Sequence, residues 1–267
     1  MTETTYGYAI LALMLVLLGV GWRLVWPVWR RVREHTASVR ALGPHGVLAM
    51  LVIIALAAAL AFTLLTAAVL EASAAFRLDV AAASVSESLR ISPLVELFSW
   101  VTHFGDTVTL LTAAVFGFAM YMAYARHEPL WPCLMTLLGA QATTWLGKYV
   151  IGKPRPDLSH IAPALQVVSP SFPSAHASGA LTVYGFLGYL AIRTIRTPGH
   201  RAEAIYILFV YIGLIGLSRV FLGVHYATDV LGGWLLGAFW LCLGMALDMR
   251  ARHHGSEAKA STTMPHP

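Results

Sequence analysis

The chain has 267 residues, of which 58% are hydrophobic and only 12% charged, and its formal net charge is +5. Soluble domains carry about 25% charged residues, so the composition excludes an ordinary soluble domain and indicates an integral membrane protein. Basic residues in such a chain usually set its orientation in the membrane, and we expect no nucleic-acid partner. Cys133 and Cys242 both lie in apolar runs, which favours buried thiols over a disulfide framework.

Seven stretches are long and apolar enough for a membrane-spanning helix, which needs about 20 residues. They cover 6–26, 46–70, 107–125, 130–151, 175–195, 204–222 and 226–248. No positive charge precedes the first stretch and no cleavage site follows it, so we interpret it as a retained helix rather than a signal peptide. The sequence therefore predicts an all-α fold, a polytopic membrane helical bundle.

Two segments depart from this pattern of spans. Residues 71–104 are too polar to cross a membrane, but their apolar residues recur at helical spacing, with Pro93 interrupting them. We expect one or two amphipathic helices that lie in the membrane interface. Residues 249–267 are polar, and we expect them to form a disordered tail.

The distribution of basic residues predicts how the bundle is oriented. If the spans alternate in direction, two thirds of the lysines and arginines fall on one side of the membrane. The positive-inside rule then places the N-terminus outside and the C-terminus in the cytoplasm. Most of the few basic residues on the outer side lie at 148–155 and at 219. We therefore expect the functional site of the protein to include these two places.

Three short segments share the outer side and lie next to predicted spans: KYVIGKPRP at 148–156, SFPSAHASG at 171–179 and SRVFLGVHYATD at 218–229. Segments about 70 residues apart in sequence would therefore meet at one face of the membrane. Three of their basic residues have few acids nearby: Lys148, Arg155 and Arg219. Guanidinium and ammonium groups suit the oxygens of a phosphate.

The second and third segments add groups for acid–base and nucleophilic chemistry. Ser174 precedes the fifth span and is expected to be its N-cap, so that the free N–H groups of the first turn point at a bound anion. His176 lies in the same turn. His225 and Asp229 are four residues apart at the start of the seventh span. They share one helical face, and the carboxylate can fix the tautomer of the imidazole.

Each of these residues also has an ordinary structural explanation. A lone basic residue at the end of a span usually anchors the helix, and a lone interfacial histidine is usually structural. Three cations, two histidines and a carboxylate at one face of the membrane are together much less common, and this combination favours an active site. Other histidines have no such context, and we interpret these as structural or solvated: His103, His127, His160 and those of the tail. Asp157 is either a local ion-pair partner of Arg155 or a turn residue.

The three segments together resemble the signature of the type 2 phosphatidic-acid phosphatase superfamily. The matching residues are Lys148 with Arg155-Pro156, then Pro173-Ser174-Ala175-His176, then Ser218-Arg219 with His225 and Asp229. Lipid phosphate phosphatases, bacterial undecaprenyl-pyrophosphate phosphatases and vanadium haloperoxidases share this signature. The resemblance covers about 45–248, the usual six-helix core. One departure is Ala175 in place of the usual Gly, which keeps the backbone N–H but loses the freedom to adopt positive φ.

The resemblance implies a role for each matching residue. His225 attacks phosphorus and forms a phosphohistidine, Asp229 orients His225, and His176 protonates the leaving oxygen and then activates water. The phosphoryl oxygens are held by Lys148, Arg155, Ser174, Arg219 and the backbone N–H near Ala175. No metal or other cofactor is needed, because three cations take its place.

The sequence thus predicts a metal-independent lipid phosphatase that acts at the outer face of a bacterial-type cytoplasmic membrane. Undecaprenyl pyrophosphate ranks first as substrate, ahead of phosphatidylglycerol phosphate, phosphatidic acid and a lipid A phosphate. Two alternatives stay open, transfer of the phosphoryl group to another lipid, and an anion-binding scaffold or transporter. A transporter needs polar groups near the bilayer midplane, whereas the charges here cluster at one face. The haloperoxidase branch is disfavoured because those enzymes are soluble.

These expectations divide the chain into three parts. Residues 1–44 form an extra N-terminal transmembrane helix and a basic cytoplasmic loop, residues 45–248 form the lipid phosphatase core, and residues 249–267 form the cytoplasmic tail. The expected partners are the bilayer and a lipid phosphate substrate, and the oligomeric state stays open.

Overall fold

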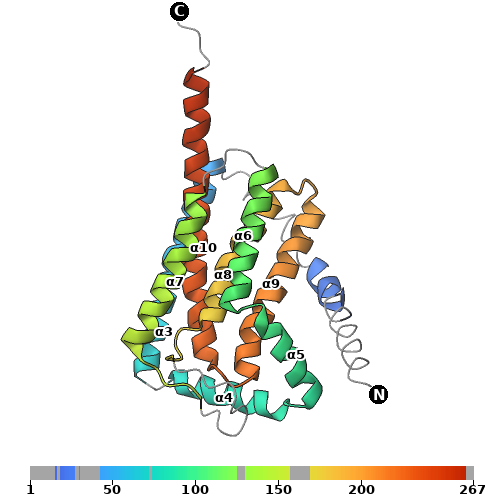
Figure 1. Cartoon of the computed structure of the whole chain (residues 1–267), viewed down its shortest axis with the longest axis vertical. Coiled ribbons are helices and arrows are strands. Elements are labelled where there is room, and N and C mark those ends of the chain that lie inside the picture. The colour runs from blue at the N-terminus through green and yellow to red at the C-terminus, as the bar shows by residue number, and fades with distance from the viewer. Residues whose placement is uncertain are drawn as a thin grey trace, which may run out of the picture.

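The computed structural model describes residues 16, 19–27, 30, 43–71, 74–124, 130–156 and 169–262. The regular secondary structure of these residues is helical (Figure 1). The principal helices are α3 (Gly43–Leu70), α4 (Ala74–Ser88), α5 (Ser92–His103), α6 (Thr107–Tyr124), α7 (Trp131–Ile151), α8 (Ala175–Thr194), α9 (Pro198–Phe221) and α10 (Ala227–Thr262). The predicted all-α bundle is therefore confirmed.

Each of the six predicted core spans is found as a helix. By length and composition α3, α8, α9 and the first part of α10, Ala227–Arg252, can cross a membrane. The helices α5 and α6 meet at a bend of 50° and together could form a fifth span. The helix α7 is long enough at 21 residues but is less apolar, because it contains Gln141 and Lys148.

Both ends of the chain differ from, or extend beyond, what was predicted. The helix α10 continues to Thr262, whereas the sequence predicted a disordered tail from 249. The physical reason is composition, since Met, Arg, Ala, Glu and Lys in this stretch are good helix formers even though they are polar. Of the extra N-terminal span predicted at 6–26, residues 16 and 19–26 are described and are helical, and the rest lies outside the described part of the chain.

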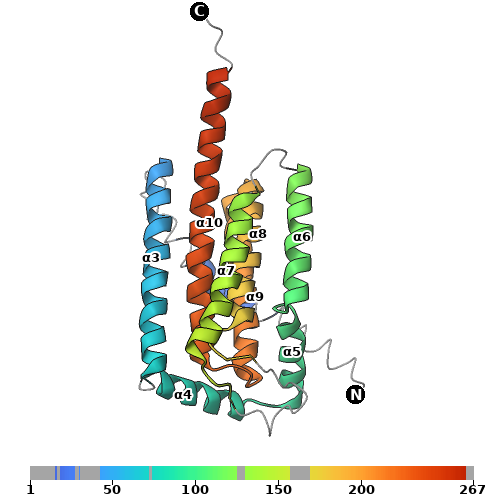
Figure 2. The same ribbon diagram turned by 60° about the vertical axis from the view of Figure 1, so that its left-hand side comes forward.

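The amphipathic segment 71–104 forms two helices, as predicted. The helix α4 lies across one end of the bundle, roughly perpendicular to the long helices (Figures 1 and 2). The helix α5 begins after Ile91 with Pro93 in its first turn, where the missing N–H of proline is not needed. Large apolar side chains of α4 are exposed, among them Phe76, Val80 and Val85. This exposure agrees with a position in the membrane interface.

The core of the bundle is formed by α8 and α10, which pack closely against each other. A side chain at Gly233 of α10 would meet the carbonyl oxygen of Ser174 at 2.5 Å and Cβ of Ala177 at 2.9 Å. Small residues let two helix backbones approach in this way. The close approach brings the first turns of α8 and α10 together, and these are the turns that carry His176 and Asp229.

Candidate active site

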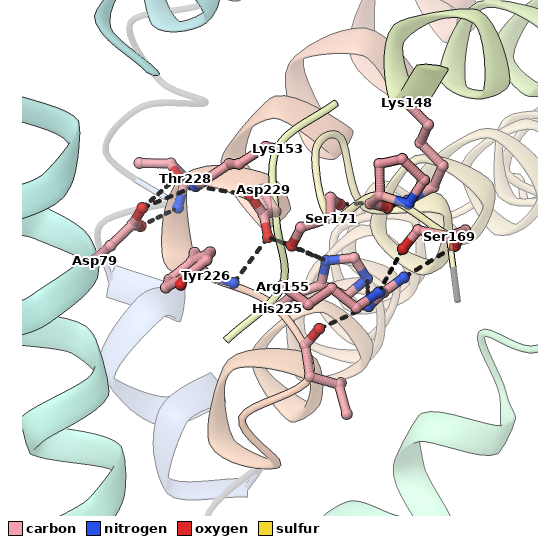
Figure 3. A network of polar contacts seen from close by, with 12 residues as sticks. Asp79, Lys148, Lys153, Arg155, Ser169, Ser171, His225, Tyr226, Thr228 and Asp229 are labelled. Atoms are coloured by element: carbon pink, nitrogen blue, oxygen red, sulfur yellow. Dashed lines mark hydrogen bonds and ion pairs between the residues drawn. The ribbon is translucent and has the colours of Figure 1, made fainter. Parts of the chain in front are cut away.

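The three predicted segments meet at the end of the bundle that α4 covers. They contribute the loop after α7, the loop that leads into α8, and the turn between α9 and α10 (Figure 3). The backbone N–H of Ser174 donates to the carbonyl oxygen of Asp229 at 2.9 Å, which joins the second segment to the third. Lys153 of the first segment contacts Asp229 at 2.9 Å. The predicted convergence of distant segments is therefore observed.

His225 and Asp229 form a buried pair. Their side chains are 2% and 0% exposed, and Nδ1 of His225 lies 3.2 Å from Oδ2 of Asp229. On the other side of the ring, Nη1 of Arg155 lies 3.2 Å from Nε2 of His225. Because arginine can only donate, Nε2 must accept and the ring proton must lie on Nδ1. The tautomer with a bare Nε2, required of a nucleophile, is fixed from both sides.

Asp229 is itself held by several donors. Its Oδ2 accepts from the backbone N–H of Tyr226 at 2.9 Å and from the hydroxyl of Ser171. Tyr226 precedes the first residue of α10 and Asp229 is the third residue of that helix, so this backbone contact is one half of a capping box. The sequence thus places Asp229 where an acidic residue also stabilises the start of a helix.

Electrostatics keep the imidazole of His225 neutral. Burial lowers the pKa of His225 to about 3, opposed by its hydrogen bond to Asp229 and by the charge of that carboxylate. The positive charges of Arg155 and Arg219 contribute to this lowering of the pKa. The imidazole is therefore neutral throughout the physiological pH range, and its Nε2, which here accepts from Arg155, carries no proton.

The predicted phosphate ligands lie around this histidine and are largely buried. Arg155 is held by its Nε, which donates to the carbonyl oxygen of Ser169 at 2.8 Å. Lys148 is only 2% exposed, and its Nζ donates to the carbonyl oxygens of Pro170 and Ser171 at 2.6 and 3.3 Å. An ammonium has three donors. One donor of Lys148 is therefore left for an anion.

Three buried side-chain donors have no hydrogen-bond partner among the described residues; one is Nε1 of Trp234, and the other two belong to predicted phosphate ligands. These two are Oγ of Ser174 and Nε of Arg219. Ser174 occupies the N-cap position of α8, as predicted, and its side chain makes no capping hydrogen bond. Arg219 is 8% exposed, and its Nη1 donates to Thr102 at 2.6 Å. Buried polar groups without partners are uncommon, and a bound phosphate would satisfy both.

Ala175, which departs from the usual Gly, is the first residue of α8. Its backbone is helical, a conformation that alanine favours. The position therefore does not require the positive φ that only glycine adopts easily. The local geometry accommodates the substitution.

His176 has a partner that the sequence did not reveal. Its Nε2 lies 2.9 Å from Oδ1 of Asp106, which sits at the bend between α5 and α6. The other oxygen of Asp106 lies 2.8 Å from Nδ1 of His103, a residue interpreted from sequence as structural or solvated. A side chain at Gly105 would meet the His176 ring at 2.7 Å, so the bend packs directly on the histidine. Asp106 lies outside the three segments that carry the family signature. The only signal in the sequence is its position directly before the predicted span 107–125.

Asp79 and Lys153 were also missed. Lys153 lies within the first segment, but its charge was not assigned a role, and Asp79 is the buried acidic residue of α4. Asp157 lies outside the described residues. No group of three or more His, Cys, Asp or Glu side chains arranged to hold a metal ion occurs in the described part of the chain.

Comparison with known proteins places the chain in a family. Residues 128–252 match the model of the PAP2 superfamily. Phosphatidylglycerophosphatase B of Bacillus subtilis is 32% identical over 196 residues, which cover 72% of this chain and 93% of that protein. Decaprenylphosphoryl-5-phosphoribose phosphatase of Mycobacterium tuberculosis is 34% identical over 145 residues, which cover 52% of this chain and 71% of that protein.

A solved structure supports the same assignment. The crystal structure of a transmembrane PAP2 type phosphatidylglycerolphosphate phosphatase from Bacillus subtilis matches with a TM-score of 0.67 and 30% identity. The match covers 73% of this chain and 96% of the other. The chain therefore belongs to the PAP2 superfamily, and it is a membrane lipid phosphatase of that family.

Proposed function

We propose that the protein hydrolyses a lipid phosphate or pyrophosphate at the outer face of a bacterial-type cytoplasmic membrane, through a phosphohistidine on His225. One observation carries this proposal above the others. The bare Nε2 of His225 faces the guanidinium of Arg155, while its Nδ1 is held by Asp229. A neutral, oriented nucleophile beside an anion-binding group is what phosphoryl transfer to nitrogen requires.

In the first step the lone pair on Nε2 attacks phosphorus, and the bond from phosphorus to the lipid oxygen breaks. His176 supplies the proton that the leaving oxygen needs. Because Asp106 can only accept, the proton on Nε2 of His176 stays with that contact, and Nδ1 is the atom that gives and regains the catalytic proton. Arg155, Arg219, Lys148 and Ser174 bind the phosphoryl oxygens as charge develops on them.

In the second step water attacks the phosphohistidine. His176, now neutral, takes a proton from the water, the bond from phosphorus to Nε2 breaks, and inorganic phosphate leaves. His225 returns to its neutral form and Asp229 keeps its charge throughout. The protein regains its starting state without any other reactant.

An apolar cavity beside His176 supports a lipid as the leaving group. It has a volume of about 230 Å³, and its lining includes His176 and Ala175 at one end and Leu110, Leu137 and Leu138 from α6 and α7. The leaving oxygen must lie next to its proton donor. The hydrocarbon attached to that oxygen would then lie against these leucines.

The substrate class follows from chemistry and from the relatives, and the membrane side follows from the positive-inside rule. The two curated relatives are named for a glycerophospholipid phosphate and for a decaprenyl phosphosugar. We rank undecaprenyl pyrophosphate and phosphatidylglycerol phosphate as the leading substrates. Both present a terminal phosphate on a lipid large enough to use the apolar cavity.

The proposal is tested by release of inorganic phosphate from purified protein in detergent with EDTA present. The substrates are undecaprenyl pyrophosphate, phosphatidylglycerol phosphate, phosphatidic acid and a lipid A phosphate. We expect release from at least one lipid, insensitivity to EDTA, and loss of turnover in His225→Ala. The exposed residue His200 of α9 provides a matched control, and His200→Ala should stay within about twofold of wild type.

Three results would contradict the proposal: no release from any of the four lipids, loss of activity on chelation, or full activity of His225→Ala. Product analysis with a second lipid present separates hydrolysis from transfer of the phosphoryl group. Appearance of a new phosphorylated lipid in place of inorganic phosphate would replace the hydrolase by a phosphotransferase.

A further inference from the structure

A partly buried lysine that is not among the proposed phosphate ligands, Lys153, connects α4 to the proposed nucleophile. Nζ of Lys153 lies 2.9 Å from Oδ2 of Asp79, 2.9 Å from Oδ1 of Asp229 and 2.7 Å from Oγ1 of Thr228 (Figure 3). An ammonium has three donors, and these three contacts use all of them. Lys153 therefore has no donor left for a phosphate, which distinguishes it from Lys148.

On the side of α4, Asp79 is tied to the first turn of α10. Its Oδ1 accepts from the backbone N–H of Thr228 at 2.9 Å, and its Oδ2 accepts from the hydroxyl of Thr228 at 2.8 Å. The first N–H groups of a helix have no partner within the helix, and a carboxylate is favourable there. Asp79 is 6% exposed. Its charge is balanced by Lys153 and by the helix terminus rather than by water.

On the side of the active site, Lys153 supplies the donor to Oδ1 of Asp229. The donors from His225, Ser171 and the Tyr226 backbone all reach Oδ2. The terminal torsion of an aspartate is broad, so contacts to one oxygen leave rotation of the carboxylate weakly restricted. A donor on the second oxygen fixes the plane of the carboxylate. The orientation of His225 follows from that plane.

Lys153 is also held from the side by an aromatic ring. Its Nζ lies 4.3 Å from the ring centre of Tyr226, the residue next to His225. A cation over an aromatic face is attracted to it. The ammonium is thus confined by two carboxylates, a hydroxyl and a ring, and its position is set by α4 and α10 together.

We propose that Asp79 and Lys153 are positioning residues for the nucleophile, acting through Asp229 on the orientation of His225. Through them α4, which lies across the end of the bundle, becomes part of the catalytic assembly. This inference rests on the proposed role of His225 as the nucleophile. The contacts of Lys153 with Asp79 and Asp229, called the bridge below, could also serve stability alone. In that case their loss would destabilise the protein without acting through Asp229.

A double-mutant cycle separates these two roles, because residues that act as a unit are not additive. The single variants are Asp79→Asn and Lys153→Met, measured on a lipid that wild type hydrolyses. We expect kcat to fall by about 10–100-fold, the usual range for a residue that orients a catalytic group, with KM within about threefold. In an Asp229→Asn background, the same substitutions should lower the residual turnover, followed with radiolabelled lipid, by less than about threefold.

Matched variants control for charge and folding. Arg77 is exposed on α4 two residues before Asp79, and Arg77→Gln should stay within about twofold of wild type. Lys153→Arg keeps the charge and should recover most of the activity lost in Lys153→Met. All variants are compared by size-exclusion elution and by thermal unfolding in detergent.

The outcomes for the bridge and for the proposed function are distinct. An inactive wild type or an active His225→Ala contradicts the proposed function. With an active wild type, the inference is overturned if Asp79→Asn and Lys153→Met keep full activity. An equal fold-loss in the Asp229→Asn background, or failure of both single variants to fold, also overturns it by assigning the bridge a structural role alone.

Discussion

The two histidine–aspartate pairs of the active site consist of the same groups in different surroundings. The side chains of His225 and Asp229 are 2% and 0% exposed, and their closest atoms are 3.2 Å apart. The side chains of His176 and Asp106 are 19% and 43% exposed, and their closest atoms are 2.9 Å apart. The first pair lies in a turn closed over by α4, and the second lies at the bend between α5 and α6.

The difference matches the two tasks. A nucleophile that forms a covalent bond needs one orientation and a free lone pair, which burial and several fixed contacts provide. An acid–base group must gain and lose a proton in each cycle. Asp106 also contacts the exposed His103, so the second pair reaches the solvent. In the proposed mechanism, burial therefore distinguishes the histidine that bonds to phosphorus from the histidine that moves protons.

The largest expected effect breaks the buried pair. Asp229→Asn offers a donor where His225 needs an acceptor, so the ring loses the tautomer with a bare Nε2. We expect kcat to fall by about 10³–10⁴-fold. The loss should be equal for a lipid substrate and for para-nitrophenyl phosphate, because both require the same nucleophile. A loss below about tenfold on either substrate would show that Asp229 does not set the tautomer.

A smaller and substrate-dependent effect is expected at the partly exposed pair, His176 and Asp106. Asp106→Asn removes the charge that supports the acid form of His176, and we expect about a 10–100-fold loss of kcat on a lipid phosphate. The burst of para-nitrophenol from para-nitrophenyl phosphate should change by less than about threefold, because that leaving group needs no proton. Asp106→Glu should recover part of the lipid activity. Equal losses on both substrates would contradict a role in protonating the leaving group.

The smallest effect concerns stability and pH. The pKa of His225 is lowered to about 3 in the folded protein, while an unfolded histidine has a pKa of about 6.5. Between these values the unfolded chain binds the extra proton, so this residue destabilises the fold as the pH falls from 6.5 towards 3. The thermal unfolding midpoint of wild type should drop more between pH 7 and pH 4.5 than that of His225→Gln. Parallel pH dependences would contradict the buried neutral state.

Both members of the buried pair, His225 and Asp229, were recognised from the sequence. Of the partly exposed pair, His176 was recognised and Asp106 was not. His225 and Asp229 are four residues apart in one helix, and such pairs can be recognised from spacing alone. Asp106 and His176 are 70 residues apart and meet because of the bend that packs Gly105 on the histidine ring. Contacts of this kind depend on the tertiary arrangement of helices. For the same reason Asp79 was not recognised as a partner of Lys153.

The fold was predictable to a similar degree. Apolar runs predicted the core helices because a membrane requires them, and helical spacing predicted α4 and α5. The bend of 50° between α5 and α6 and the continuation of α10 to Thr262 were not predicted. Hydropathy measures whether a segment suits the bilayer, and it contains little information on bends or on polar helices that extend beyond it.

The order of the chain determines when the protein can become active during its synthesis. Asp79 and Thr228, which are in direct contact, are 149 residues apart, and the nucleophile lies just before the last helix. A nascent chain that ends before α9 already has Lys148, Arg155 and His176 but lacks the atom that attacks phosphorus. On the proposed mechanism, catalysis therefore requires α9 and α10 to join the helices that are made before them.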